Sequence, residues 1–327
     1  MKDSRVFEQK NHNKNVFSIN RKRYIWAYTF MMPQIIWFIG LSIYPIIMSY
    51  VYAFYDWNGL EELDNFIGLA NFKELLQTPE FWNAFQNSLI YAIGFTTVSV
   101  TLGLILALIL NEPKFKAKGF YRTIFFLPVV TTAAIVGIIM QTMFGTQGTV
   151  NQLLIALGIM QKPVSWLLDP ILAMILLIVV GSWKNIGITM IYWLTGLQTI
   201  PQDIHEAAQI DGAGYWKRLR YITLPLLAPI GFTILLLTLT SSMHVFDLVK
   251  TLTNGGPYYS TETLELYIYR YAFASVGGGA RTGFASAAGV LLGLFVFLIT
   301  GLFAAIGWTI NRRRKNNLIK INRGIQT

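Results

Sequence analysis

The stretch between residues 200 and 225 carries the sequence signals best suited to contact with another protein. Pro201 and Asp203 predict the start of a short helix, because proline fits the first turn and aspartate can cap it. Gly212 and Gly214 predict its end, since glycine tolerates the left-handed conformation that terminates a helix. The spacing therefore predicts an isolated helix of about two to three turns.

Inside this short helix the side chains are small, apart from one carboxylate. Ala207 and Ala208 let another protein approach the backbone closely, and the neighbouring Glu206 can receive an arginine or lysine from it. These residue types predict a docking helix. An ordinary connecting loop is the alternative interpretation.

The residue types needed for catalysis are scarce. Cysteine is absent, and the histidines are His12, His205 and His244. The sequence contains no HExxH motif, no paired histidines, and no Ser-His-Asp order with helical spacing, so we predict no metal site and no catalytic residues. No glycine-rich loop followed by Lys-Ser/Thr occurs either, so the chain is not expected to hydrolyse nucleotide. A binding site or a transport path is favoured over an enzyme.

The elements that position these residues follow from composition. The chain has 327 residues, of which 54% are hydrophobic and 13% charged, whereas a soluble domain carries roughly 25% charged residues. This balance excludes disorder, a coiled coil and a disulfide scaffold. Long uncharged runs, each near the roughly 20 residues that cross a bilayer, predict an all-α polytopic membrane protein with six transmembrane helices. These helices are expected near 26–54, 86–110, 122–144, 171–196, 222–248 and 283–310.

The net charge of +10 is concentrated in particular loops and tails between the apolar runs. This distribution argues against a nucleic acid partner and for a membrane lipid surface. Twenty of the 26 basic residues fall in four segments. These are the N-terminal tail, the 111–122 loop, the 197–220 loop and the tail after residue 310. Because basic loops stay in the cytoplasm, both termini are predicted to be cytoplasmic, on a multi-pass protein of the cell membrane.

The same pattern predicts four segments along the chain. Residues 1–25 form a cytoplasmic tail, and 26–84 hold the first transmembrane helix followed by an acidic extracytoplasmic segment. Residues 85–308 form a core of five helices, and 309–327 a basic cytoplasmic tail.

The loop also resembles the signature of a known family. Glu-Ala-Ala, three residues, Gly, nine residues, Ile, one residue and Leu-Pro fit this chain without a gap, from Glu206 to Pro225. This pattern is similar to the coupling loop of the membrane subunits of binding-protein-dependent ABC importers. Further stretches resemble the carbohydrate branch, near the maltose and glycerol-phosphate permeases. They are Pro33 with Ile43-Tyr44-Pro45, Asn71-Phe72, Phe81-Trp82 through Asn87-Ser88, Arg122 to Pro128, Gly196 to Pro201, Leu252 to Pro257, and Tyr267 to Arg270.

The resemblance implies a type I ABC importer transmembrane fold, with the core formed around residues 85–308 and the coupling loop at 197–222. It implies coupling to an ATPase through Glu206, Ala207, Ala208, Asp211 and Gly212. The implied partners are a second permease subunit, a cytoplasmic ATPase dimer that binds ATP and Mg, and an extracytoplasmic solute-binding protein. The receptor is expected to face the acidic segment 56–80 and the stretch 250–283. The implied substrate is a sugar or sugar derivative, and no cofactor is expected on this chain.

Polar groups within apolar helices mark the expected sugar site, because they are costly in a membrane and face cavities. From the fourth helix we expect Asn185 and Tyr192, and from the fifth Thr238, Ser241 and Ser242. The maltose relative implies contacts near Thr238, Ser242 and Val245, where valine departs from a polar pattern. Lys184 with Asp247 is interpreted as an ion pair or as residues reaching toward the helix ends, and His244 as a hydrogen-bonded packing residue.

Two other transporter classes remain as alternatives. An ion-coupled secondary transporter needs intramembrane acids, and only Asp247, near a helix end, fits that requirement. A passive solute channel needs a filter motif or a ring of like residues, and the sequence shows neither.

Overall fold

The computed structural model describes residues 24–112, 115–273 and 279–325, and its described part is all-α, with only an isolated bridge between Tyr55 and Phe66. In chain order, the helices are α2 (Tyr44–Tyr52), α3 (Ala70–Gln77), α4 (Pro79–Asn111), α5 (Lys118–Val130), α6 (Ala133–Met143), α7 (Thr149–Ala156), α8 (Pro170–Gln198), α9 (Gln202–Ile210), α10 (Tyr215–Arg218), α11 (Leu224–Ser242), α12 (Phe246–Leu252), α13 (Leu264–Phe273) and α14 (Thr282–Ile325).

The predicted spans reappear as long apolar helices. Within the described residues, five helices are long and apolar enough to cross a membrane, and a sixth span results if the bent pair α5–α6 counts as one. The five are Tyr24–Tyr52, which continues through the π-helical turn Ile39–Ile43 into α2; Pro79–Asn111; Pro170–Gln198; Tyr215–Ser242, in which the π-helical turn Leu219–Thr223 joins α10 to α11; and Thr282–Ala305. The charge-free runs therefore located the spans.

The third span, expected as one helix over 122–144, is bent. Lys118–Val130 and Ala133–Met143 meet at 95°, with Thr131 and Thr132 in extended conformation between them. Pro128 lies in the last turn of α5. A proline removes one helical hydrogen bond and crowds the preceding turn, so this end of α5 is weakened before the chain turns.

The fifth span was expected to run over 222–248, and that boundary is wrong. The helix ends at Ser242, and α12 begins at Phe246 after a three-residue break. His244 and Asp247 therefore lie in the break and on the following helix rather than on the span itself. The break contains neither proline nor glycine.

The centre of the bundle is the crossing of α4 and α8, which make the most extensive helix contact among the described residues. Small residues allow the backbones to approach. A Cβ on Gly103 would lie 2.9 Å from the Thr189 methyl and 3.2 Å from the Met190 nitrogen. Gly181 of α8 likewise leaves room for the Tyr91 hydroxyl of α4. Close packing through small residues is the usual way that helices associate without help from water.

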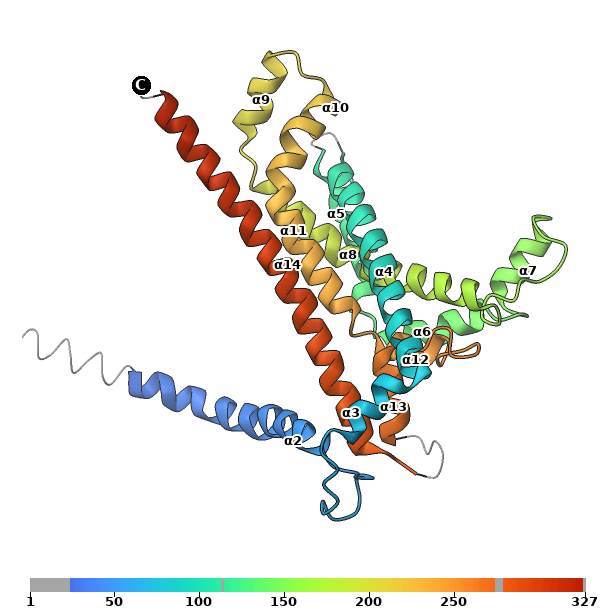
Figure 1. The fold of residues 1–327 in the computed structure, drawn as a ribbon. Helices are drawn as coiled ribbons and strands as arrows, with labels where there is room; N and C mark the ends of the chain where they lie inside the picture. Colours follow the sequence, from blue (N-terminus) through green and yellow to red (C-terminus); the bar gives the residue numbers. More distant parts are fainter. Residues whose placement is uncertain (1–23, 113–114, 274–278, 326–327) are drawn as a thin grey trace, which may run out of the picture.

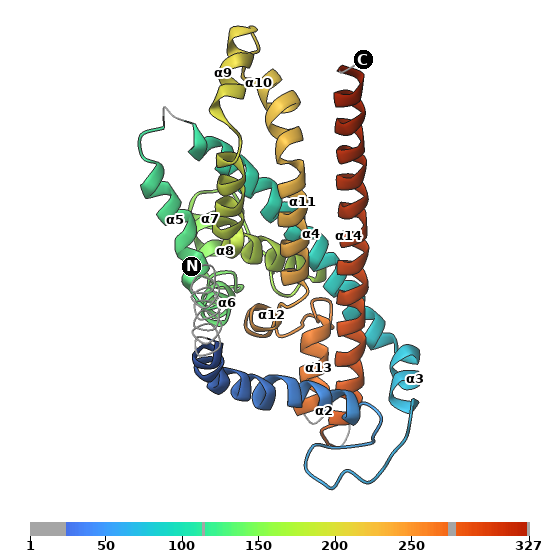
Figure 2. The ribbon, with the colours of Figure 1, turned by 90° about the vertical axis from the view of Figure 1, so that its left-hand side faces the viewer.

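Figures 1 and 2 show that the α9–α10 hairpin and the C-terminal end of α14 lie at the same end of the bundle, while α3, α13 and the start of α14 lie at the opposite end. The helix Tyr24–Tyr52 extends sideways from that opposite end and is exposed along most of its length. The basic loop 197–220 and the C-terminal segment thus share one side, as the charge pattern requires. Which side faces the cytoplasm stays a prediction.

Candidate functional site

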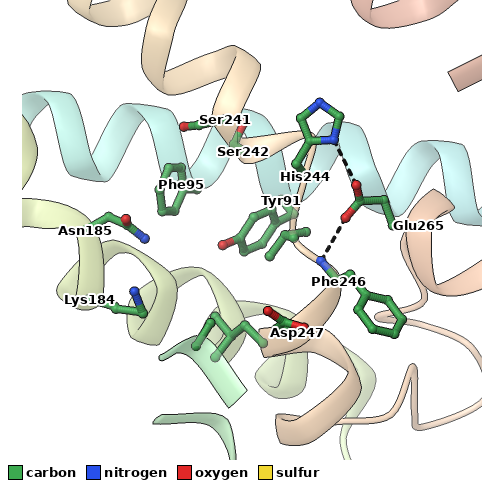
Figure 3. A pocket seen from close by; sticks show the side chains of 13 residues that line it. Tyr91, Phe95, Lys184, Asn185, Ser241, Ser242, His244, Phe246, Asp247 and Glu265 are labelled. Atoms are coloured by element: carbon green, nitrogen blue, oxygen red, sulfur yellow. Dashed lines mark hydrogen bonds and ion pairs between the residues drawn. The ribbon is translucent and has the colours of Figure 1, made fainter. Parts of the chain in front are cut away.

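A cavity of about 420 Å³ lies where α4 and α8 meet the break between α11 and α12. Figure 3 shows its polar side chains converging from α8, from the end of α11 and from α13. This volume falls within the roughly 300–1,000 Å³ typical of small-molecule sites. The lining residues are Tyr91, Phe95, Ala133, Lys184, Asn185, Ser241, Ser242, His244, Val245, Phe246, Asp247, Leu248 and Glu265.

Helix α8 contributes an amide and an ammonium group. Asn185 donates from Nδ2 to the Gly181 carbonyl at 3.1 Å, which leaves its Oδ1 available as an acceptor. Lys184 lines the same cavity as Asp247, but no ion pair joins them among the described residues. The ion-pair interpretation of Lys184 and Asp247 is therefore wrong, and both charges face the cavity.

The end of α11 contributes two hydroxyl groups. Ser241 donates to the Thr238 carbonyl at 2.9 Å and Ser242 to the Leu239 carbonyl at 2.6 Å. With their protons used in the helix, both oxygens keep lone pairs that can accept hydrogen bonds from a ligand. This wall of the cavity is therefore a row of acceptors.

Two of the five residues expected to bind sugar lie away from the cavity lining. Thr238 is buried and donates to the Ile234 carbonyl at 2.7 Å. Tyr192 is 38% exposed; it lies about two turns beyond Asn185 along α8 and does not line the cavity. Asn185, Ser241 and Ser242 line it together, and Val245 contributes an apolar patch beside them.

The aromatic face of the cavity comes from residues that sequence reasoning missed. Tyr91 and Phe95 project from α4, with ring centroids 5.5 Å apart and planes inclined by 25°. Because they are four residues apart in a long apolar run, their pattern is typical of ordinary core packing. Only the crossing of α4 over α8 brings them to the polar groups.

A carboxylate from α13, Glu265, was also missed. It accepts a hydrogen bond from the Phe246 backbone N–H at 2.9 Å, and its other oxygen lies 2.8 Å from Nδ1 of His244. The hydrogen bond with Glu265 raises the pKa of His244, against the opposing effect of burial. The prediction that His244 is hydrogen-bonded is confirmed, but its side chain is 56% exposed, so its interpretation as a packing residue is wrong.

The predicted docking helix is present as α9. It follows Pro201 and ends before Gly212, whose φ is +75°. Asp203 lies in the first turn without a side-chain capping bond, so its expected capping role is wrong. Pro201 itself occupies the cap position, and this leaves Asp203 inside the helix. The helix closes through hydrogen bonds from Gly212 N to Gln209 O at 3.0 Å and from Ala213 N to Ala208 O at 2.9 Å.

Most of α9 is open to its surroundings. Glu206, Ala207, Asp211 and Gly212 are exposed, while Ala208 is buried against the turn. Ile210 is 87% exposed. An exposed large apolar side chain beside an exposed carboxylate is the composition expected of a contact surface.

Comparison with known proteins identifies the family. The family model described as "Binding-protein-dependent transport system inner membrane component" matches residues 99–313. The lactose transport system permease protein of Rhizobium radiobacter is 39% identical over 259 residues, covering 77% of this chain and 85% of that protein. The arabinooligosaccharides transport system permease protein of Bacillus subtilis is 31% identical, covering 85% of this chain and 86% of that protein.

A solved structure has the same fold. A chain of a bacterial ABC transporter involved in the import of the acidic polysaccharide alginate superposes with a TM-score of 0.77 and 27% identity, covering 88% of this chain and 97% of that chain. The family model, the two relatives and this solved structure each match more than half of the chain. The chain therefore belongs to the family of inner membrane components of binding-protein-dependent transport systems.

Proposed function

We propose that the chain is the permease subunit of an ATP-driven ABC importer that carries a sugar or sugar derivative across the cell membrane. The observation that carries this proposal is the cavity at the α4–α8 crossing, in which aromatic rings and hydrogen-bonding side chains face one another. The names of the relatives, which are lactose and arabinooligosaccharide permeases, support a sugar as the substrate.

A sugar presents hydroxyl groups around its rim and C–H groups on its ring faces. Tyr91 and Phe95 offer an apolar face for the ring. Ser241, Ser242 and the Asn185 oxygen offer acceptors for hydroxyl protons. Few polar groups in a mostly apolar enclosure are the usual way that a site fixes the orientation of a small ligand.

Helix α9 is proposed as the contact with a separate cytoplasmic ATPase. It stands clear of the bundle at the end where α14 also ends, and Glu206 is exposed on it. When the helix enters a groove of the ATPase, the carboxylate must meet a basic group, because burying it alone costs several kcal/mol. ATP and Mg²⁺ belong to that partner.

The working assembly is proposed to be two permease subunits, two ATPase subunits and an extracytoplasmic solute-binding protein. Closure of the ATPases on ATP moves α9, and α9 moves the helix bundle between two access states. The receptor is proposed to dock at the opposite end, where Glu74 of α3 and Arg281, the residue before α14, form a bidentate ion pair with both contacts at 2.7 Å.

The coupling proposal is tested by reversing one charge. We expect Glu206→Lys to leave the chain in the membrane but to reduce ATPase co-purification, because a lysine repels the basic group that Glu206 meets. Glu112→Lys is the matched control, since Glu112 is an exposed carboxylate just after α4 and outside α9. Retention of the ATPase by Glu206→Lys would show that this carboxylate does not seat the helix.

The cavity proposal is tested by the complementary change. Ser242→Ala removes one acceptor from the cavity and touches nothing near α9, so it is expected to lower uptake of radiolabelled lactose, maltotriose or arabinotriose without loss of the ATPase. Unchanged uptake with Ser242→Ala and with Asn185→Ala would argue against sugar binding in this cavity.

A further inference from the structure

The break between α11 and α12 forms a wall of the cavity, yet nothing in its own sequence explains it. Met243, His244 and Val245 include no helix breaker. Val245 has φ −125° and ψ 39°, outside the helical region. In a continuous helix the Phe246 N–H would bond to the carbonyl four residues before it. In this fold it bonds to the Glu265 carboxylate instead.

One carboxylate contacts the break on both sides of Val245. Oε1 of Glu265 lies 2.8 Å from Nδ1 of His244, and Oε2 accepts the Phe246 N–H at 2.9 Å. Figure 3 shows both interactions converging on the same side chain. We call Glu265, His244 and Phe246 the break clamp.

The backbone around Glu265 is held in place by contacts with α4 and by burial. Just before Glu265, the Leu264 N–H donates to the buried Ser88 hydroxyl of α4 at 2.9 Å. Leu266 and Tyr267, which follow Glu265, are buried. The backbone of α13 around Glu265 is thus attached to α4, and the Glu265 side chain extends from it to the connection between α11 and α12.

The position of the break decides which side chains reach the cavity. Ser241 and Ser242 line it from the last turn of α11, and Val245 and Leu248 line it from the break and from α12. If α11 continued as a helix past Ser242, each later residue would turn by about 100° to a new direction. The part of the cavity wall formed by Val245 and Leu248, which faces Ser241 and Ser242 across the same cavity, therefore depends on where the helix stops.

We propose that Glu265 is a positioning residue of the cavity, which holds the break between α11 and α12 in place by binding His244 and the Phe246 N–H at the same time. What the break clamp does for transport rests on the proposed function, whereas its effect on the break does not. Glu265 itself need not touch the sugar.

The His244 side of the break clamp depends on protonation. The charged groups that face the same cavity are Glu265 on α13, Asp247 on α12 and Lys184 on α8, and Tyr91 on α4 is the remaining titratable group. A protonated imidazole makes a charge-assisted hydrogen bond to the carboxylate, which is about twice as strong as a neutral one. The break clamp is therefore tightest below the pKa of His244 and loosens as the pH rises through it.

The absence of cysteine makes a direct test simple. A nitroxide is attached to Val245→Cys in the full-length chain in lipid nanodiscs, and its mobility is recorded by electron paramagnetic resonance. Glu265→Ala is expected to raise the ratio of mobile to immobile label about tenfold, since a hydrogen bond to a charged group is lost. Glu265→Gln keeps the side-chain volume and an acceptor for the Phe246 N–H, so an intermediate ratio is expected, and this variant decides the result if Glu265→Ala does not fold.

Asp247→Asn is the matched control, because it removes another carboxylate that lines the cavity. The Asp247 side chain makes no hydrogen bond to the described residues of the break, so the label mobility of this variant is expected to equal that of the parent. A second readout is the pH profile. Label mobility in the parent should rise as the pH increases above 6.5, through the raised pKa of His244, and Glu265→Gln and His244→Asn should both abolish that rise. The proposal is overturned if Glu265→Ala and Glu265→Gln leave the label as immobile as in the parent, or if the pH profile persists in Glu265→Gln. Neither sugar nor ATPase is needed, so failure of the proposed function leaves this result intact.

Discussion

Arg270 donates from Nη2 to the Glu262 carboxylate across 2.9 Å, and Glu262 is only 1% exposed. The guanidinium also lies 4.3 Å from the centre of the Tyr259 ring. On the other side, the Asn87 amide of α4 donates to the Glu262 carbonyl at 3.1 Å. The ion pair fastens the loop before α13 to α13, and the Asn87 bond fastens the same loop to α4. Together they fix the position of the backbone that carries Glu265.

Removing the cation should therefore be costly. Arg270→Met keeps much of the packing of the stem but leaves a buried carboxylate unpaired. Above pH 7, where most of the Glu262 carboxyl is ionised in the parent, we expect this to destabilise the protein by about 3–5 kcal/mol. The measurement is the unfolding midpoint in detergent. Arg281→Met is the control, because the Arg281–Glu74 pair is 37% and 49% exposed and such pairs contribute about 0–1 kcal/mol. Equal losses in the two variants would contradict the distinction.

The same carboxylate should make stability depend on pH. Burial raises the pKa of Glu262 from 4.5 to about 7, although Arg270 opposes the rise. The folded state then holds this proton more tightly than the unfolded chain, so the contribution is complete below about pH 4.5 and is lost as the pH rises through about 7.

The raised pKa of His244 acts in the same direction at higher pH, because its contribution is complete below 6.5 and lost above that value. We expect the melting temperature to fall as the pH rises from 5 to 8. Glu262→Gln should remove only the portion of this fall that occurs below pH 7. His244→Asn should remove only the portion of the fall that occurs at higher pH. A parental slope in Glu262→Gln would refute this assignment.

A close approach between α5 and α8 should depend on one glycine. A Cβ at Gly187 would meet the Phe125 carbonyl and would lie 2.8 Å from the Phe126 Cα. Because both neighbours are backbone, they cannot move aside cheaply, so Gly187→Val should destabilise the chain by about 1–3 kcal/mol or more. Gly289→Val in α14 is the control, since no described atom lies within 4 Å of its Cβ position. Size-exclusion profiles after graded heating should separate the two variants.

The end of α9 offers a control for backbone conformation. Gly212 has φ +75° and Gly214 has φ −65°, and a Cβ added at either position would have no described atom within 4 Å. Gly212→Asp should therefore cost on the order of 1 kcal/mol locally and misdirect the turn, whereas Gly214→Asp adds the same charge without that strain. Both variants should reach the membrane, but only Gly212→Asp should lose most of the co-purified ATPase. Equal losses would mean that charge, and not the turn, is responsible.

The sequence alone could predict those features of the site that are determined by residues close together in the chain, and not those that depend on contacts between distant segments. The ends of α9 were predictable because Pro201 and Gly212 act on their own backbone. The break after Ser242 was not, because it depends on Glu265, which follows His244 by 21 positions. Tyr91 and Phe95 have apolar neighbours in sequence and acquire polar ones only where α4 crosses α8. The third span was expected as one helix although it contains Pro128, and the 95° bend beyond that residue accompanies the packing of α6 against α12.

The most direct measurement is sugar uptake into proteoliposomes that contain this chain with its partner permease, its ATPase and the solute-binding protein. ATP-driven import predicts accumulation of radiolabelled lactose, maltotriose or arabinotriose only when ATP can be hydrolysed, and none when an ion gradient is the sole energy source. Uptake that persists without the ATPase, driven by a sodium or proton gradient or running passively to equilibrium, would contradict the proposed function.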